Sequence, residues 1–409
     1  MASSSDRKVP PFVALKNADF RWMWSGQLIS EAGSQMQLVA ISWHVYLLTN
    51  SPVALGLIGL IRVLPTIVFS LVGGVYADAH DRRRILFITQ GTMMILAAIL
   101  GLFTTAGWIS VGVIYLLLAA ISAALAFDGP AWQAIVPNLV PAGHLTNALS
   151  LNNTMRQTAQ IVGPALGGYV IAWLGVGAVY WINMASFVAV LFALIKMKTP
   201  AQKSLGASKV SLSALREGIH FVFHSRLLLS TTLLDFFSTL FGSASALLPI
   251  FAREILMVGP QGLGILYSAQ SAGAVAAGVG MSLLGNVKKQ GALVLGALTV
   301  YGVATAIYGG SRWFPLSIIA LALIGAADTI STIMRHNIRQ LSTPDHLRGR
   351  MTSVIRIFSN GGPQLGNLEA GLLAALIGAP LSVITGGIGT LLVVGFVAWR
   401  VPSLRDFQR

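Results

Sequence analysis

Apolar residues are concentrated in twelve long runs, each close to or above the roughly 20 residues that a membrane-spanning helix needs. The breaks between runs carry turn-forming residues, such as Asn50-Ser51-Pro52 and Gly378-Ala379-Pro380. We therefore predict an all-α membrane protein with twelve transmembrane helices. Their approximate ranges are 21–48, 53–77, 85–106, 110–136, 147–174, 178–197, 227–252, 263–286, 291–309, 315–339, 350–376 and 380–399.

Basic residues are distributed unevenly among the loops that these ranges define. If the N-terminus is cytoplasmic, 21 of the 27 Lys and Arg residues, Arg339 among them, fall in loops on the cytoplasmic side, and only Arg253 and Arg312 fall in outer loops. Cytoplasmic loops of membrane proteins carry such an excess. Both termini are therefore expected in the cytoplasm. Residues 1–20 have no apolar core, so no cleaved signal peptide is expected.

The composition excludes several classes of protein. Only 10% of the 409 residues are charged and 55% are hydrophobic, whereas soluble domains average about 25% charged residues. The net charge of +14 would suggest nucleic-acid binding in a soluble protein. Here it reflects membrane orientation, and no nucleic-acid partner is expected. The absence of cysteine removes thiolate catalysis and thiolate metal sites.

The longest connection between spans divides the chain into two similar halves. We predict a six-helix bundle over 1–198, a cytoplasmic linker over 199–226 and a second six-helix bundle over 227–409. Within the linker, Leu212–His224 has an amphipathic pattern typical of a helix at the membrane interface. The Gly-Pro pair at 163–164 recurs at 362–363. Two related halves with a site between them are typical of transporters.

Nine charged residues, five acids and four arginines, lie inside the predicted spans. On the lenient insertion scale, nine charges facing lipid would cost on the order of 25 kcal/mol. That cost exceeds the stability of an ordinary fold. These side chains must therefore face one another or a wet cavity.

Four of the acids share one depth, about 15 Å from the cytoplasmic edge and close to the midplane. We predict that they bind protons, because burial and nearby arginines act in opposite directions on a carboxyl group. The alternative is that acid–arginine pairs only hold helices together. This alternative has less support for Glu31 and Asp235, because no basic residue is close to them in sequence. The predicted proton-coupling residues are Glu31, Asp128, Asp235 and Asp328, and the predicted charge partners are Arg156, Arg335 and Arg356.

Polar and aromatic residues on the same spans predict a substrate cavity. An apolar, aromatic cavity with a few acids suits large amphipathic or cationic molecules. Packing or lipid contact is the alternative role for each aromatic residue. The candidate cavity residues are Gln27, Gln35, Met36, Trp43, Phe127, Trp132, Phe236 and Phe237.

Two motifs are similar to those of the major facilitator superfamily. Together with the twelve spans, they give a resemblance to this family that covers essentially the whole chain. The segment from Gly74 to Arg84 resembles the family's G-x-L-A-D-R-x-G-R-K loop between the second and third spans, with Asp81 where a glycine is usual. Four of its residues are the predicted cytoplasmic gate: Gly74, Asp78, Arg82 and Arg83. The resemblance implies that Asp78 locks the cytoplasmic side by pairing with a helix end or an arginine. The arginines could instead act only as topology determinants.

The second motif lies in the fifth span and resembles the G-P-x-x-G-G ending associated with antiporters, through Gly163, Pro164, Gly167 and Gly168. Tight helix packing is an equally good account of these small residues. Residues 127–141 further resemble bacterial exporters of the macrolide-efflux and enterobactin type. The resemblance implies that the first, fourth, seventh and tenth spans line a central cavity, and that the protein lies in the bacterial cytoplasmic (inner) membrane.

The expected function is therefore proton-coupled export of hydrophobic drugs or secondary metabolites by alternating access. Siderophore export, or proton-coupled import through the same fold, is the alternative within transport. A membrane enzyme or a non-transporting receptor is disfavoured, because the sequence has no phosphate-binding G-x-x-x-x-G-K-[ST] and no H-E-x-x-H. We expect no catalytic residue, metal or cofactor. The expected partners are an amphipathic small molecule, protons and membrane lipids, and the chain is expected to be a monomer.

Overall fold

The computed structural model describes residues 10–198, 212–285 and 287–408, without the side chains of 70–79 and 212–215. Every regular element in these ranges is helical. The first half holds α1 (Ala18–Thr49), α2 (Pro52–Ala79), α3 (Arg82–Thr105), α4 (Val111–Leu139), α5 (Leu145–Leu174) and α6 (Val176–Lys196), with short 3-10 turns η1 (Val13–Lys16) and η2 (Ala142–His144).

The second half begins with α7 (Leu212–His224), which coincides with the predicted amphipathic segment and packs against α13. The remaining elements are α8 (Arg226–Phe241), η3 (Ala244–Leu247), α9 (Leu248–Ile250), the π-helical η4 (Phe251–Ile255), α10 (Gly259–Leu284), α11 (Gln290–Gly310), α12 (Phe314–Leu341), η5 (Asp345–Leu347), α13 (Arg348–Ile377), α14 (Ala379–Arg400) and α15 (Pro402–Arg405). Part of the predicted linker, residues 199–211, lies outside the described residues.

The seventh predicted range is not one continuous helix. Helix α8 ends at Phe241, and the chain continues through three short turns to Ile255. The Tyr301 hydroxyl donates a hydrogen bond of 2.9 Å to the Gly242 carbonyl oxygen. The ring of Tyr301 also fills the space that a side chain at position 242 would need. The prediction of an unbroken helix over 227–252 is therefore wrong at this point.

By length and hydropathy, eight helical segments in the described part of the chain could cross a membrane. Four of the predicted spans, now α1, α5, α10 and α13, are not among them. Each of these four is rich in polar residues or glycine, and each packs on the opposite half or on a helix that does. Their weaker hydropathy therefore follows from protein contacts in place of lipid contacts. That all twelve helices cross the membrane stays a prediction.

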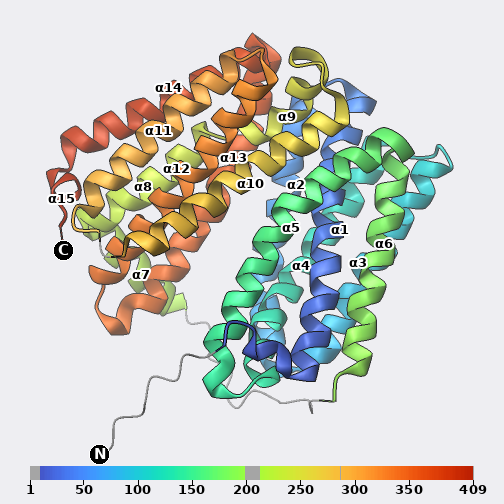
Figure 1. The fold of residues 1–409 in the computed structure, drawn as a ribbon. Helices are drawn as coiled ribbons and strands as arrows, with labels where there is room; N and C mark the ends of the chain where they lie inside the picture. The colour runs from blue at the N-terminus through green and yellow to red at the C-terminus, as the bar shows by residue number, and fades with distance from the viewer. Residues whose placement is uncertain (1–9, 199–211, 286, 409) are drawn as a thin grey trace, which may run out of the picture.

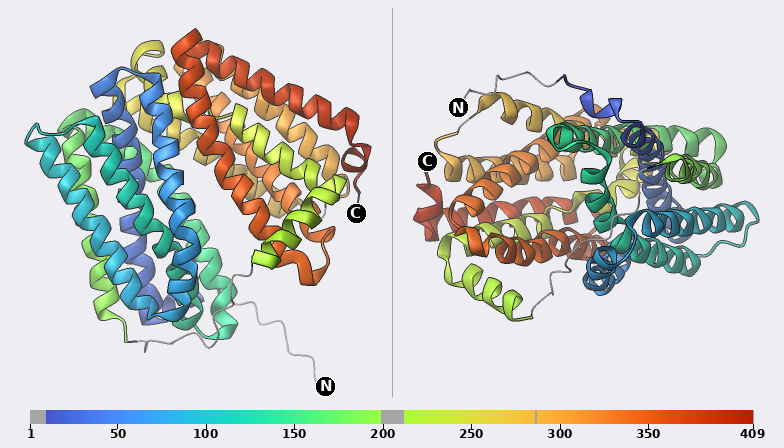
Figure 2. Two further views of the ribbon diagram at one scale, coloured as in Figure 1. Left: turned by 180° about the vertical axis from the view of Figure 1, so that it is seen from behind. Right: turned by 90° about the horizontal axis from the view of Figure 1, so that it is seen from below.

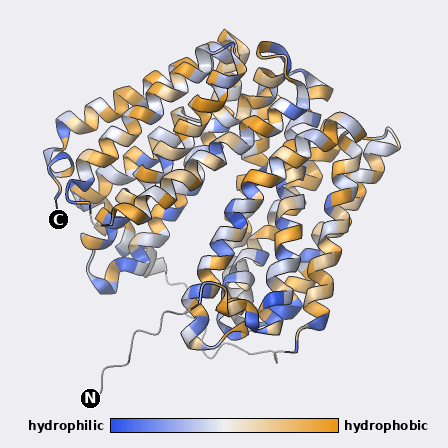
Figure 3. Ribbon diagram, viewed as in Figure 1, coloured by the Kyte–Doolittle hydropathy of each residue, from blue (hydrophilic) through white to orange (hydrophobic). Residues whose placement is uncertain are grey.

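The helices form two groups, α1–α6 and α8–α14, which approach each other at one end and diverge towards the other (Figures 1 and 2). We call the end that holds Asn50, Gly175 and Gly378 the converging end. Both ends of the described chain lie at the diverging end. Apolar residues extend along the helices, while hydrophilic residues gather at the diverging end of the first group (Figure 3).

Two helix crossings, α5 with α10 and α2 with α13, form the main contact between the groups. At each crossing two glycines meet: Gly168 with Gly264, and Gly56 with Gly371. A Cβ atom at Gly168 would lie 2.4 Å from the Pro260 carbonyl oxygen, and one at Gly371 would lie 2.6 Å from that of Pro52. Only glycine allows the backbones to approach this closely, so the two crossings are related elements of one interface.

Polar contacts reinforce the interface at the converging end. Arg253 of η4 donates from Nη1 to Asn50 Oδ1 at 2.7 Å, and its guanidinium lies 5.7 Å from the centre of the Tyr46 ring. The Tyr46 hydroxyl donates to the Glu254 carboxylate. The last turn of α1 is therefore tied to the short helices that follow α8.

Candidate functional site

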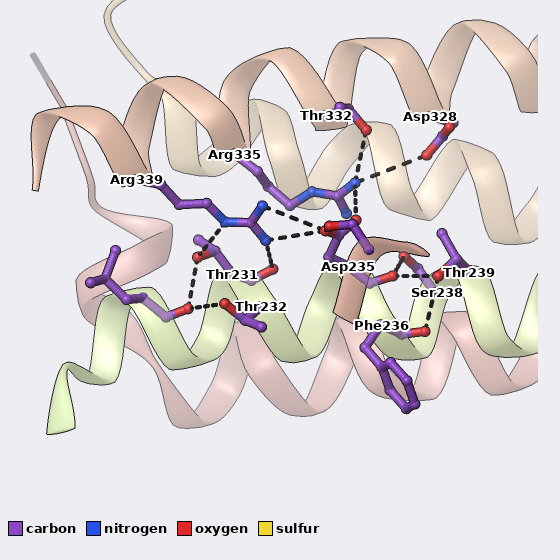
Figure 4. A network of polar contacts seen from close by, with 12 residues as sticks. Thr231, Thr232, Asp235, Phe236, Ser238, Thr239, Asp328, Thr332, Arg335 and Arg339 are labelled. Atoms are coloured by element: carbon purple, nitrogen blue, oxygen red, sulfur yellow. Dashed lines mark hydrogen bonds and ion pairs between the residues drawn. The ribbon is translucent and has the colours of Figure 1, made fainter. Parts of the chain in front are cut away.

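A group of charges, buried except for Asp328, lies in the second half between α8 and α12 (Figure 4). Arg335 Nη2 lies 3.0 Å from Asp235 Oδ1, and Arg339 Nη2 lies 3.3 Å from Asp235 Oδ2. Asp328 is further away, with its Oδ1 3.9 Å from Arg335 Nη2. We call Asp235, Asp328, Arg335 and Arg339 the C-terminal charge cluster. Its two acids and two arginines sum to zero formal charge.

Neutral groups add hydrogen bonds to this cluster, but Arg335 Nε and Nη1 have no hydrogen-bond partner among the described residues. Arg339 also donates to the Thr231 carbonyl oxygen at 2.8 Å and to its hydroxyl at 3.3 Å. Ser359 of α13 donates to Asp235 Oδ2, and Arg335 donates to the Thr332 hydroxyl at 3.0 Å. Asp235 thus accepts from two arginines and a serine, which leaves it strongly held between α8, α12 and α13.

Arg339 corrects the sequence analysis, which counted it among the cytoplasmic loop residues. It is 6% exposed and lies inside α12, one turn beyond Arg335. Asp235 therefore has basic partners although none is close to it in sequence, because they come from a helix about one hundred residues away. The signal in the sequence was the spacing Asp328, Arg335 and Arg339, which places all three on one side of a helix.

The first half contains a polar cavity of about 210 Å³, which we call the N-terminal cavity. It lies between α1, α2, α3, α4 and α6. The polar and charged residues that line it are Gln27, Ser30, Glu31, Ser34, Gln35, Gln37, Arg62, Gln90, Ser122, Asp128 and Asn183, and the apolar ones are Leu38, Ile41, Met93, Leu118, Ile121, Leu125 and Phe187. The predicted cavity residues Gln27 and Gln35 are thus among them.

The two acids of the N-terminal cavity are held by neutral donors. Asp128 is 5% exposed and accepts from the Thr89 hydroxyl at 2.6 Å and from Gln90 Nε2 at 2.9 Å. Glu31 accepts from Gln35 Nε2 at 3.1 Å. Neither carboxylate has an ion pair with a basic residue within the described ranges. This environment differs from that of Asp235.

Arg62 is a cavity residue that the sequence analysis did not single out. It projects from α2 and lines the N-terminal cavity with the two acids. Its guanidinium makes no hydrogen bond or ion pair with any residue that the structure describes. Tyr267 of α10 lies near Arg62. One arginine and two acids give the cavity lining a formal charge of −1.

The other predicted site residues lie elsewhere. Arg156 and Arg356 are exposed and have no hydrogen-bond or ion-pair partner in the described part of the chain. Met36 lines a separate apolar pocket between α1, α5 and α6. The remaining aromatic candidates pack within the helix groups, Trp43 and Trp132 in buried cores, Phe127 against Phe69, and Phe236 and Phe237 against each other.

The loop motif contacts helix ends within the first half. Arg82 donates to the Ala134 carbonyl oxygen of α4 at 3.3 Å, and Arg83 donates to that of Ile195 on α6 at 3.2 Å. Asp81, which replaces the usual glycine, caps α3 by accepting from the Arg83 amide at 3.0 Å. The side chain at Asp78 and position 74 fall outside the described side chains, so the predicted lock by Asp78 stays a prediction.

The antiporter-type motif packs α5 against two helices. A Cβ atom at Gly163 would lie 2.5 Å from Gln35 Cβ, and one at Gly167 would lie 3.0 Å from Met36 Cα, both on α1. Gly168 meets α10 at the crossing between the halves. Pro164 lies inside α5 between them. The motif therefore joins the cavity-lining helix α1 to the interface.

Comparisons with known proteins agree with this architecture. The family described as transmembrane secretion effector matches residues 9–408. The multidrug efflux pump Tap of Mycolicibacterium fortuitum is 26% identical, over 93% of this chain and 95% of that protein. The enterobactin exporter EntS of Escherichia coli K12 is 24% identical, over 95% and 93%. The crystal structure of the nucleoside transporter NupG has a TM-score of 0.74 at 12% identity, covering 93% of this chain and 98% of that one.

Proposed function

This chain belongs to the transmembrane secretion effector family of the major facilitator superfamily. From that premise we propose that it is a proton-coupled antiporter, which exports hydrophobic or cationic drugs or secondary metabolites. It is a transporter and not an enzyme. The observation that carries the proposal is the pair of cavity carboxylates, Asp128 and Glu31, which are held only by neutral donors.

The charge balance of the two halves supports a proton site in the first half. The N-terminal cavity carries one uncompensated negative charge, so a proton or a cationic substrate can neutralise it without displacing a resident cation. A proton that reaches Asp235 must instead break contacts with Arg335 and Arg339. We therefore assign proton coupling to Asp128 and Glu31. The C-terminal charge cluster, with Asp235 and Asp328, then holds α8 and α12 together.

Alternating access follows from the way the halves meet. The contacts at Gly168–Gly264 and Gly56–Gly371 lie towards the converging end, together with the Asn50–Arg253 hydrogen bond. Rocking about the two crossings would break the contacts of η4 with α1 and bring the diverging ends together. In this proposal the diverging end is cytoplasmic, the protein is a monomer in the bacterial cytoplasmic membrane, and lipids surround its apolar surface.

The test of proton coupling is transport by the full chain in proteoliposomes under an imposed pH gradient. Ethidium serves as the cationic substrate. We expect efflux driven by the gradient in the wild type, and its loss in Asp128→Asn and Glu31→Gln. Asp345→Asn is the matched control, because this acid is exposed and pairs only with Arg348. Undiminished gradient-driven transport in both cavity variants would overturn the assignment.

Alternating access has a separate test that uses the absence of cysteine from the chain. Asn50→Cys and Arg253→Cys introduce a pair of thiols at a hydrogen-bonded contact between the halves. A short, reducible thiol cross-linker should stop transport by the double variant, and reduction should restore it. Each single variant serves as the control. Full transport by the cross-linked double variant would contradict rocking at this contact.

Siderophore export is the second candidate, supported by similarity to the enterobactin exporters over more than nine-tenths of both chains. The same proteoliposomes would test it with a catecholate substrate in place of ethidium. The direction of substrate movement relative to the imposed gradient separates export from proton-coupled import. Movement of substrate and protons in the same direction would favour the importer.

A further inference from the structure

The N-terminal cavity has opposite charges at its two ends. Arg62 lies ten residues into α2 from Pro52 at the converging end, and Asp128 lies eleven residues from Leu139 at the other end of α4. With a helical rise of 1.5 Å per residue, the two side chains are separated by about 10 Å along the helix axes. Gln90 lies beside Asp128, because it and Thr89 bind that carboxylate, and Glu31 lines the same cavity from α1.

Arg62 is the least satisfied charged group of the cavity. It has no hydrogen bond or ion pair within the described residues, and Tyr267 offers it only a neutral hydroxyl that already contacts Ser42 and the Ser245 carbonyl oxygen. The Arg62 side chain is half-buried, and a partly buried charge without a counter-charge is unfavourable. A ligand that carries only positive charge would leave this arginine uncompensated.

The lining between the two ends is mixed. Ser30, Ser34 and Gln27 make no side-chain hydrogen bonds with residues in the described ranges, so their polar groups are available on the α1 side. Opposite them, Leu118, Ile121 and Leu125 of α4 present apolar side chains. A ligand that fits this arrangement has two polar ends joined by an apolar segment.

We propose that the N-terminal cavity binds an amphoteric ligand, with an anionic group on Arg62 and a cationic group on Glu31 and Asp128. The proposal rests on the transport function above and narrows its preferred cationic substrates to molecules that also carry an anionic group. The planar guanidinium matches a carboxylate through paired hydrogen bonds, and the two carboxylates accept from an ammonium group. Arg62 is thus a binding residue that selects amphoteric molecules over simple cations.

The test measures binding to the purified full chain in detergent by isothermal titration calorimetry, without a pH gradient. The probes are 8-aminooctanoate, octylamine and octanoate, which share an alkyl chain and differ in their charged ends. Charge-assisted hydrogen bonds contribute about 1.5–3 kcal/mol, or roughly 10- to 100-fold in affinity. We expect 8-aminooctanoate to bind at least about tenfold more tightly than either single-ended probe. The shorter 4-aminobutyrate should bind more weakly, because it cannot reach both ends.

Variants identify the end at which each group binds. Arg62→Gln should remove the advantage of 8-aminooctanoate over octylamine while octylamine binding persists, which also shows that the variant is folded. Arg62→Lys should retain part of the advantage. Asp128→Asn should weaken binding of octylamine more than that of octanoate. Arg312→Gln is the matched control, because this exposed arginine lies in the other half and does not line the cavity, and it should change nothing.

Equal affinity of the wild type for octylamine and 8-aminooctanoate would overturn the proposal, as would an unchanged preference in Arg62→Gln. Failure of this experiment is distinguishable from failure of the proposed function. Gradient-driven ethidium transport can persist when amphoteric selectivity is absent, and amphoteric binding can be measured when the gradient drives no transport.

Discussion

The two halves of the molecule hold their buried charges in opposite ways. In the second half, Asp235 lies between two arginines, and the C-terminal charge cluster is neutral overall. In the first half, Asp128 and Glu31 are held by a threonine and two glutamines, and Arg62 has no partner among the described residues. Halves with related folds thus place acids on corresponding helices in different electrostatic environments.

The difference indicates that the two halves have different roles in transport. A neutral set of ion pairs resists changes in protonation, because losing one charge leaves its partners buried and unpaired. A carboxylate bound by hydroxyl and amide donors can gain or lose a proton while its hydrogen bonds rearrange. The first half is therefore suited to binding and release, and the second half to rigidity.

The largest expected effect is on folding stability when an acid becomes an amide. Asp235→Asn leaves Arg335 and Arg339 without their shared counter-charge, which should destabilise the protein by about 3–5 kcal/mol. Asp128→Asn keeps an oxygen that can accept from Thr89 or Gln90, so its loss should be about 1 kcal/mol or less. Thermal unfolding of the two purified variants in the same detergent measures the difference.

Two further variants complete this experiment. Replacing Asp235 and Arg339 together, with Asn and Gln, should recover part of the stability, because fewer unpaired charges remain in the cluster. Asp345→Asn reports the effect of losing an exposed acid. Equal losses in Asp235→Asn and Asp128→Asn would contradict the contrast between the halves.

The sequence predicted the local structure of this protein better than its charge pairing. Hydropathy and turn residues located the helices, and the amphipathic pattern located α7 at its observed bounds. The break after Phe241 was missed because it depends on Tyr301, a residue of α11 whose contact with Gly242 exists only in the folded bundle. The periodicity of apolar residues indicates which face of a helix is buried, but it does not indicate which residue of another helix contacts that face.

The same limit applies to the candidate sites. Depth along the spans brought Glu31, Asp128, Asp235 and Asp328 to attention, yet it could not show that Asp235 alone contacts two arginines. Arg339 was misassigned because a basic residue near a span end has the same pattern whether it faces water or a buried acid. Arg62 was one of the four arginines counted inside the predicted spans, but no local pattern could show that it lines a cavity between five helices.

An intermediate effect is expected when arginine is replaced by lysine in each half. Arg339 uses several guanidinium nitrogens to bind Thr231 and Asp235, a geometry that a lysine ammonium cannot reproduce. Arg339→Lys should therefore lower stability by about 1–2 kcal/mol. Arg62→Lys loses no such contact and should change stability by less than about 0.5 kcal/mol. Chemical or thermal unfolding compares the pair, and a larger loss in Arg62→Lys would show that Arg62 is held by contacts in the unliganded protein.

The smallest and most direct comparison removes one hydroxyl donor from each acid. Thr89→Val keeps the shape of the side chain but takes away one of the two donors that Asp128 has among the described residues, so we expect a loss of about 1 kcal/mol. Ser359→Ala takes a donor from Asp235, but Arg335 and Arg339 still hold that carboxylate, so the loss should be about half as large. Thermal unfolding of both variants against the wild type measures the two losses. If Ser359→Ala loses more stability than Thr89→Val, the serine contributes more than the arginine pair to the binding of Asp235. The ion pairs of the second half would then not be sufficient to fix this carboxylate.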